Sequence, residues 1–193
     1  MESIAEVFLP LQTMNIKNIV VNPPISVYPI RTPIATILYK DPMFTLQKIS
    51  ILTPFLTIHS WDPKKGRLEL SDSSEGLSLL KLQAFYECLL KSLIAHPEWS
   101  GVPKITVDEL KMRFQPIVAN KLITLYINDQ HDGLYSYSKK WIKGVTDDLL
   151  QPGQQVRIAL RFQGLMFLKN DSPITFYRLQ HQITKLYFRL PSL

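Results

Sequence analysis

The chain has 193 residues, of which 46% are hydrophobic and 20% are charged, a composition that supports a folded core and excludes an intrinsically disordered chain. Cys88 is the only cysteine, which excludes an intramolecular disulfide and a thiolate metal cluster and indicates a reducing compartment such as cytosol or nucleus. No apolar run approaches the roughly 18 residues of a membrane span, and the acidic start MESIAEVFLPLQ is unlike a signal peptide. We therefore expect a protein that is neither secreted nor bound to a membrane.

The net charge of +6 is unevenly distributed along the chain. Residues 97–193 carry 13 Lys and Arg against 8 Asp and Glu, so most of the excess lies in the second half. A basic half in an otherwise ordinary composition indicates an anionic partner, with nucleic acid favoured over an acidic membrane surface.

The first third of the chain is rich in proline, since 8 of the 14 prolines precede residue 64. Prolines 23, 24, 29 and 33 exclude a helix, so residues 1–34 are predicted to form an extended arm that could add to the sheet of another subunit. Residues 45–71 alternate in part around the turn DPKKG, which predicts a β-hairpin.

One long helix is predicted over residues 77–96. Apolar side chains recur there at helical spacing, the preceding SDSSE holds cap candidates, and Pro97 ends the pattern. Cys88 falls inside this run, where a buried and inert thiol is expected.

The second half is predicted to consist mostly of strands, at 121–129, 154–169 and 174–190. On the cleanest of them, Val156, Ile158, Leu160 and Phe162 share one face while Arg157, Ala159, Arg161 and Gln163 share the other. Gly164 indicates a bulge or a sharp bend in mid-strand. The predicted fold is mostly β with one long helix (α+β). We expect an oligonucleotide-binding (OB)-like β-barrel over 35–190, carrying the N-terminal arm and the hairpin as additions.

Signatures of catalysis, metal binding and cofactor binding are missing from the sequence. The histidines at 59, 96, 131 and 181 form no ligand pair, and there is no phosphate-binding glycine loop and no nucleophile elbow. The pairs Asp147–Asp148 and Asp129/Asp132 could hold Mg²⁺, but both lie beside turn signals, where Asp is common. We therefore expect no enzyme activity, no metal and no cofactor.

The stretch GLYSYSKKWIKG (133–144) alternates aromatic rings with lysines in a segment too polar for a core. Single-stranded nucleic acid offers phosphates to cations and unstacked bases to rings, each stacked base contributing roughly 1–3 kcal/mol. Arginines on the polar face of the 154–169 strand and a ring with cations in HSWDPKKGR extend the pattern. The predicted DNA-binding residues are Tyr135, Tyr137, Lys139, Lys140, Trp141, Lys143, Arg157, Arg161, Arg178, Trp61, Lys64, Lys65 and Arg67.

The order of these features resembles the single-stranded DNA-binding proteins of poxviruses and related large nucleocytoplasmic DNA viruses. The resemblance covers about residues 40–190. It lies in the hairpin LQKISILTPFLTIHSWDPKKGRLELS, the helix LLKLQAFYECLLKSLIAHPEW, the segment PKITVDELKMRFQPIVANKL and the pair VRIALRFQGLMFL and ITFYRLQHQITKLYF. It implies an OB-fold core that coats single-stranded DNA (ssDNA) without strong sequence preference during viral replication and repair. Self-association, contacts with replication proteins and a location at cytoplasmic replication sites or in the nucleus are implied with it.

Two departures from that family and three rival functions stay open. The chain ends in YFRLPSL where family members commonly carry an acidic regulatory tail, and the proline-rich arm has no counterpart. The rivals are a scaffold protein, an RNA-binding module and a Mg²⁺-dependent nuclease.

Overall fold

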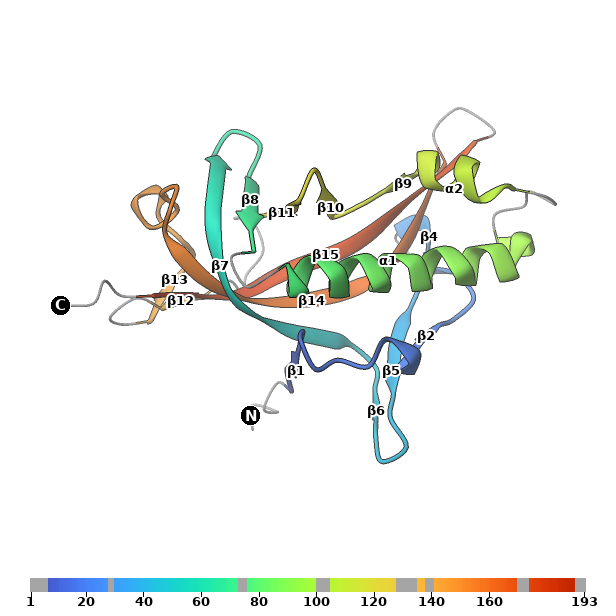
Figure 1. The fold of residues 1–193 in the computed structure, drawn as a ribbon. Helices are drawn as coiled ribbons and strands as arrows, with labels where there is room; N and C mark the ends of the chain where they lie inside the picture. Colours follow the sequence, from blue (N-terminus) through green and yellow to red (C-terminus); the bar gives the residue numbers. More distant parts are fainter. Residues whose placement is uncertain are drawn as a thin grey trace.

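The computed structural model describes residues 7–27, 30–72, 76–99, 105–127, 135–137, 141–169 and 174–189. Within them the protein is mostly β, with two α-helices and two sheets (Figure 1). The α-helices are α1 (Leu77–Ala95) and α2 (Val107–Arg113). The strands are β1 (Leu9–Pro10), β2 (Ile19–Val21), β3 (Ile25–Val27), β4 (Ile30–Ala35), β5 (Ile37–Lys40), β6 (Thr45–Leu46), β7 (Ile49–Asp62), β8 (Arg67–Ser71), β9 (Phe114–Gln115), β10 (Val118–Ala119), β11 (Leu122–Tyr126), β12 (Tyr135–Tyr137), β13 (Trp141–Lys143), β14 (Gln155–Lys169) and β15 (Thr175–Phe188).

The larger sheet is strongly bent and mostly antiparallel. Its strands follow the order β10-β11-β8-β7-β14-β15-β12-β13, with β1, β3, β4 and β9 attached beside this path. The path has two ends, so the described strands form an open sheet, and the closed OB-like barrel expected from the sequence is not confirmed. The hairpin predicted over 45–71 is confirmed as the antiparallel pair β7–β8.

The core lies between this sheet and α1, which runs along one face of the β14–β15 hairpin (Figure 1). The alternation expected on β14 is confirmed, because Val156, Ile158, Leu160 and Phe162 are buried while Arg157 and Arg161 are only partly buried. The rings of Phe85 on α1 and Phe162 stack with centroids 4.7 Å apart. The helix therefore covers the apolar side of β14. On the other side Arg157 and Arg161 stay partly exposed, whereas Ala159 between them is fully buried.

Helix α1 matches the predicted range 77–96 to within one residue, and the structure adds a second, shorter helix that the sequence analysis did not include. The second helix, α2, begins with a capping box. The Thr106 side chain accepts from the Glu109 backbone N–H at 3.2 Å, and the Glu109 carboxylate accepts from the Thr106 N–H at 2.9 Å. Reciprocal caps of this kind satisfy the otherwise unpaired N–H groups of a first turn, which lets a short helix form.

The N-terminal stretch packs on the sheets of its own chain. β1 pairs in parallel with β7, and β4 pairs with β14. Leu11 and Met14 are buried, and the Lys81 Nζ of α1 donates to the Met14 carbonyl at 2.7 Å. The described part of residues 1–34 thus contributes to the core.

The bulge expected at Gly164 is present. The β14–β15 register shifts between Phe162 and Gly164, and Gly164 has φ 146°. A Cβ at this position would lie 2.6 Å from Ile34 Cγ2 and 2.8 Å from the Ala35 carbonyl oxygen, so β4 approaches too closely for any other residue.

Gly164→Ala is expected to lower the free energy of unfolding by about 3 kcal/mol, since an unfavourable φ and a backbone clash act together. Urea unfolding followed by circular dichroism measures the loss. Gly153→Ala is the matched control, because Gly153 also has a positive φ (87°) but has open space around it. Equal losses in the two variants would contradict the close approach of β4.

Candidate nucleic-acid interface

Three rows of residues cross the sheet on the side opposite to α1. Directly paired residues of neighbouring strands place their side chains on the same side of a sheet. The first row is Phe55, Arg157, Tyr187 and Tyr137. The second is Leu52, Ala159, Lys185, Tyr135 and Lys143, and the third is Ser50, Arg161 and Gln182. We call the surface that these rows share the Arg157 face.

A bulge in β15 determines which of its residues join the Arg157 face. The register shifts where Ala159 pairs with Lys185 and Leu160 with Ile183, which leaves Thr184 as an extra residue. The Thr184 hydroxyl donates to the Ala159 carbonyl at 3.3 Å. Because an extra residue reverses the alternation, Lys185 and Tyr187 lie on the same side as Arg157.

The two tyrosines of β12 are held outward by the serine between them. Ser136 is fully buried and its hydroxyl donates to the Gly144 carbonyl at 2.5 Å, across the β12–β13 hairpin. Tyr135 and Tyr137 are 44% and 39% exposed. Exposed rings on a strand that is anchored from behind are suited to stacking against a flat ligand.

The Arg157 face is basic. Strands β12 to β15 contain no Asp or Glu, and Arg189 follows β15 directly. Their cations are Lys143, Arg157, Arg161, Lys169, Arg178 and Lys185.

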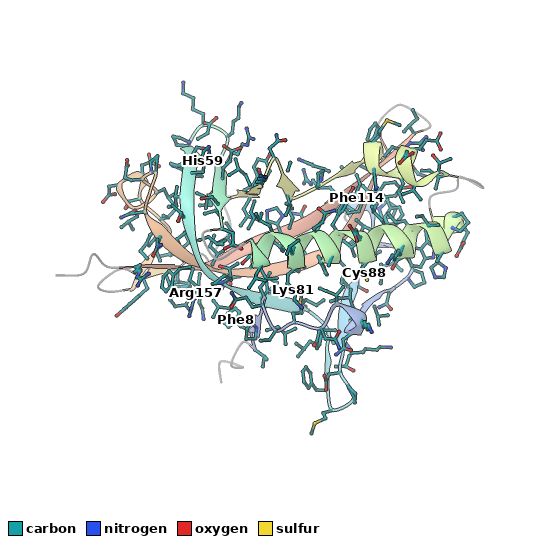
Figure 2. The ribbon with its side chains drawn as sticks, viewed as in Figure 1. Phe8, His59, Lys81, Cys88, Phe114 and Arg157 are labelled. Atoms are coloured by element: carbon teal, nitrogen blue, oxygen red, sulfur yellow. The ribbon has the colours of Figure 1, made fainter. Side chains whose placement is uncertain are left out.

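Aromatic rings hold several of these cations in place. The Arg157 and Arg189 guanidinium carbons lie 4.9 and 5.8 Å from the Phe55 ring centroid, and the Lys185 Nζ lies 5.0 Å from the Phe8 centroid (Phe8 and Arg157 are labelled in Figure 2). A ring orients a cation without neutralising it, so these side chains keep their attraction for anions. Sequence reasoning missed Phe8, Phe55, Lys185, Tyr187 and Arg189.

The predicted cluster around the β7–β8 turn lies apart from this face. Asp62 is seven residues beyond Phe55 on β7, roughly 23 Å at the usual rise per strand residue. Arg67 pairs with Glu69 at 2.5 Å, and Lys65 lies 3.9 Å from Asp62. The Trp61 Nε1 donates to Asp147 at 2.7 Å and its ring packs against the core, while Lys64 is exposed. Trp61 is therefore held by a hydrogen bond and by core contacts at this end of β7.

Arg178 shares the outer side of the β14–β15 ladder but is distant from Arg157. It pairs with Met166, nine residues along β14, which is roughly 30 Å. Trp141 holds the register position beside Tyr137. Its side chain, together with Lys139 and Lys140, lies outside the described part of the chain.

Arg178 instead borders a pocket of about 180 Å³ between β11 and β15. One edge of β15 pairs with β9 at Tyr177–Arg178 and with β12 at 185–187. Among the described residues, no strand pairs with this edge of β15 between Arg178 and Lys185. Strand β11 lies across the gap that this leaves. A hydrogen bond crosses this gap, because the Tyr126 backbone N–H donates to His181 Nε2 at 3.3 Å.

His181 forms this bridge only as a neutral ring. Its Nε2 can accept the Tyr126 N–H only while it carries no proton, so the ring proton sits on Nδ1, 3.3 Å from the Leu179 carbonyl oxygen. Burial lowers the pKa of His181 and the nearby Arg178 charge lowers it further, although the Leu179 carbonyl opposes the shift.

His181 is therefore expected to make the protein less stable in mild acid. Because its pKa is lower folded than unfolded, the unfolded chain takes up the proton first, and stability falls as the pH drops below about 6.5. Urea unfolding between pH 7.5 and 5.5 should show a steeper loss in the wild type than in His181→Gln. His59→Gln, at an exposed position, should behave as the wild type does. If the free energy of unfolding falls equally with pH in all three proteins, the hydrogen bond between Tyr126 and His181 is refuted.

The described residues include Asp147, Asp148 and Cys88, which a catalytic site could use. They contain no group of three or more His, Cys, Asp or Glu that could hold a metal ion. Asp147, a candidate Mg²⁺ ligand, accepts the Trp61 hydrogen bond. Burial raises the pKa of the Cys88 thiol, against a smaller effect of Lys91, and so disfavours the nucleophilic thiolate. None of the described helices is long and apolar enough to cross a membrane.

Comparison of the chain with protein-family models, with curated proteins and with solved structures gave no match.

Proposed function

We propose that the protein is a non-catalytic, sequence-tolerant ssDNA-binding protein that coats unpaired strands during DNA replication and repair. The Arg157 face would bind the strand, with Arg157, Arg161, Lys143 and Lys185 contacting phosphates. Tyr135, Tyr137 and Tyr187 would stack on bases, and Phe55 would hold Arg157 and Arg189 in place.

The observation that carries this proposal is the register of the rows. Aromatic and cationic residues from β7, β14, β15 and β12 become direct neighbours on one side of a sheet whose strands β12 to β15 bear no acid. Binding without sequence preference needs this pairing, since cations attract the backbone and rings accept any base. Among the described residues, no comparable group of His, Cys, Asp and Glu could hold a metal ion.

The finer architecture that we propose is OB-like. β9 pairs with β15 and leads through two residues into β10, at the other end of the sheet path. This return of the chain supports a barrel-like curvature, with the Arg157 face on its outer surface. Self-association and contacts with replication proteins belong to the same proposal through the family resemblance.

A gel-shift titration tests the proposal against its rivals. Labelled (dT)30 should be retarded at lower protein concentration than a duplex of equal length, and it should stay intact when Mg²⁺ is added. Equal or stronger retention of (rU)30 would favour the RNA-binding alternative. Absence of any retardation in low salt would leave the scaffold function, and shortening of the strand would reveal a nuclease.

A further inference from the structure

The pocket between β11 and β15 is a candidate binding site in its own right. Its volume of about 180 Å³ slightly exceeds the roughly 150 Å³ of an engineered cavity that binds benzene. It is smaller than the roughly 300–1,000 Å³ of pockets that enclose drug-sized ligands. The pocket therefore has room for a single six-membered ring with small substituents.

The lining combines apolar walls with hydrogen-bonding amides. Ile117, Ile127, Leu179 and Ile183 supply apolar surface, and the Tyr126 side chain, 43% exposed, lies at the rim. The Gln180 amide oxygen accepts from Arg178 at 3.1 Å and the Gln182 oxygen accepts from Gln163 at 3.3 Å. Both amide oxygens thus already accept a hydrogen bond, so the Nε2 groups are available to donate to carbonyl oxygens of a ligand.

The charges at the pocket select an anionic ligand. Asp and Glu do not occur among the lining residues, and His181 is held neutral by its bond from Tyr126. The exposed Arg178 at the border is the charged group of this lining. A flat ring with carbonyl oxygens that is attached to a phosphate matches the pocket volume, the amide donors and the positive charge of Arg178. A pyrimidine nucleotide is such a ligand.

The pocket adjoins the Arg157 face. Gln182 lines the pocket and pairs directly with Arg161, the last row of that face. Arg178 lies four to five residues further along the ladder, roughly 15 Å away. A strand that leaves the Arg157 face past Arg161 therefore reaches the pocket before it reaches Arg178.

We infer that this pocket takes up one pyrimidine base of the bound strand, while Arg178 contacts the adjoining phosphate. This inference rests on the proposed ssDNA binding and adds a base preference at one position. Two donor amides suit the two carbonyl oxygens of thymine best. Adenine carries no carbonyl oxygen, so it matches these amide donors less well.

The test is a titration of the ¹⁵N-labelled full chain with dTMP and, separately, with dAMP, followed by NMR. dTMP should shift the amide signals of Tyr126, Gln180 and Gln182, and dAMP should not. Gln180→Ala with Gln182→Ala should weaken dTMP binding roughly tenfold, because two hydrogen bonds are lost. Gln83→Ala on α1 removes an amide elsewhere and should leave dTMP binding unchanged. Equal shifts with dAMP, or wild-type affinity in the double variant, would overturn the pyrimidine site.

A competition experiment shows whether the pocket binds a base of the DNA strand or a free nucleotide independently of the strand. If the pocket holds a base of the strand, (dT)12 should shift the same signals and displace dTMP. If dTMP binds equally well with (dT)12 present, the inference is wrong. Failure of the proposed function gives a different result. In that case (dT)12 would not bind the Arg157 face of either the wild type or the Gln variants, whether or not dTMP binds the pocket.

Discussion

Arg157→Ala combined with Arg161→Ala is expected to weaken binding to every ssDNA sequence by roughly 100-fold or more, since each hydrogen bond to a charged group contributes roughly 1.5–3 kcal/mol. The salt dependence should change as well. Each phosphate contact on a single strand contributes roughly −0.7 to the slope of log K against log[salt], so the loss of two contacts should flatten the slope by about 1.4. Fluorescence titrations with (dT)12 at several salt concentrations measure both quantities.

The control for this variant removes the same charge elsewhere. Lys40 on β5 and Lys91 on α1 are both exposed and lie outside the Arg157 face. Lys40→Ala with Lys91→Ala should reduce affinity only slightly and leave the slope nearly unchanged. If this control weakens binding as much as the arginine variant does, net charge alone attracts the DNA and the Arg157 face is not the site.

Phe85→Ala is expected to lower the free energy of unfolding by about 3–5 kcal/mol, because it removes a buried ring and leaves a cavity. Phe85 is fully buried and stacks on Phe162 at 4.7 Å, so its ring joins α1 to β14. In a chain of this size such a loss corresponds to a decrease in Tm of roughly 6–20 °C. Differential scanning calorimetry gives the value directly.

Leu80→Ala on the same helix is the matched comparison. Leu80 is 65% exposed, so its truncation should change stability by less than about 0.5 kcal/mol. Both variants should bind (dT)12 like the wild type at a temperature where they are folded, since α1 covers the opposite side of the sheet. A Phe85→Ala protein as stable as Leu80→Ala would mean that α1 does not close the core over β14.

Local periodicity predicted the elements that depend on their own sequence. The strict alternation of β14 separated Arg157 and Arg161 from Val156, Ile158 and Leu160, and the burial of those side chains agrees. The helix over 77–96 followed from its apolar spacing in the same way. α2 was missed although TVDE carries the cap of its first turn, because a seven-residue helix shows too little periodicity to stand out.

The composition of the Arg157 face could not be predicted, because it depends on register. Simple alternation from Phe176, Arg178, Gln180 and Gln182 would place Thr184, Leu186 and Phe188 on the outer side. The extra residue at Thr184 reverses this order and brings Lys185 and Tyr187 outward. Phe55 and Phe8 join from segments far away in sequence, which a single sequence cannot position.

The pocket was missed for a related reason. Its walls come from β11, the β9–β10 connection and β15, and it exists because one edge of β15 lacks a partner between β9 and β12 among the described strands. In the sequence, His181 is one of four histidines that form no ligand pair. Its bond from Tyr126 appears only when β11 and β15 come together.

Photocrosslinking maps the ssDNA-binding surface most directly. A (dT)12 oligonucleotide with 5-bromodeoxyuridine at successive positions is irradiated with the wild-type protein, and the attached peptides are identified by mass spectrometry. We expect crosslinks at Tyr135, Tyr137 and Tyr187, which decrease as salt is raised. Crosslinks confined to α1, α2 or the β7–β8 turn would show that the strand lies elsewhere and that the rings and cations of the Arg157 face do not form the DNA-binding site.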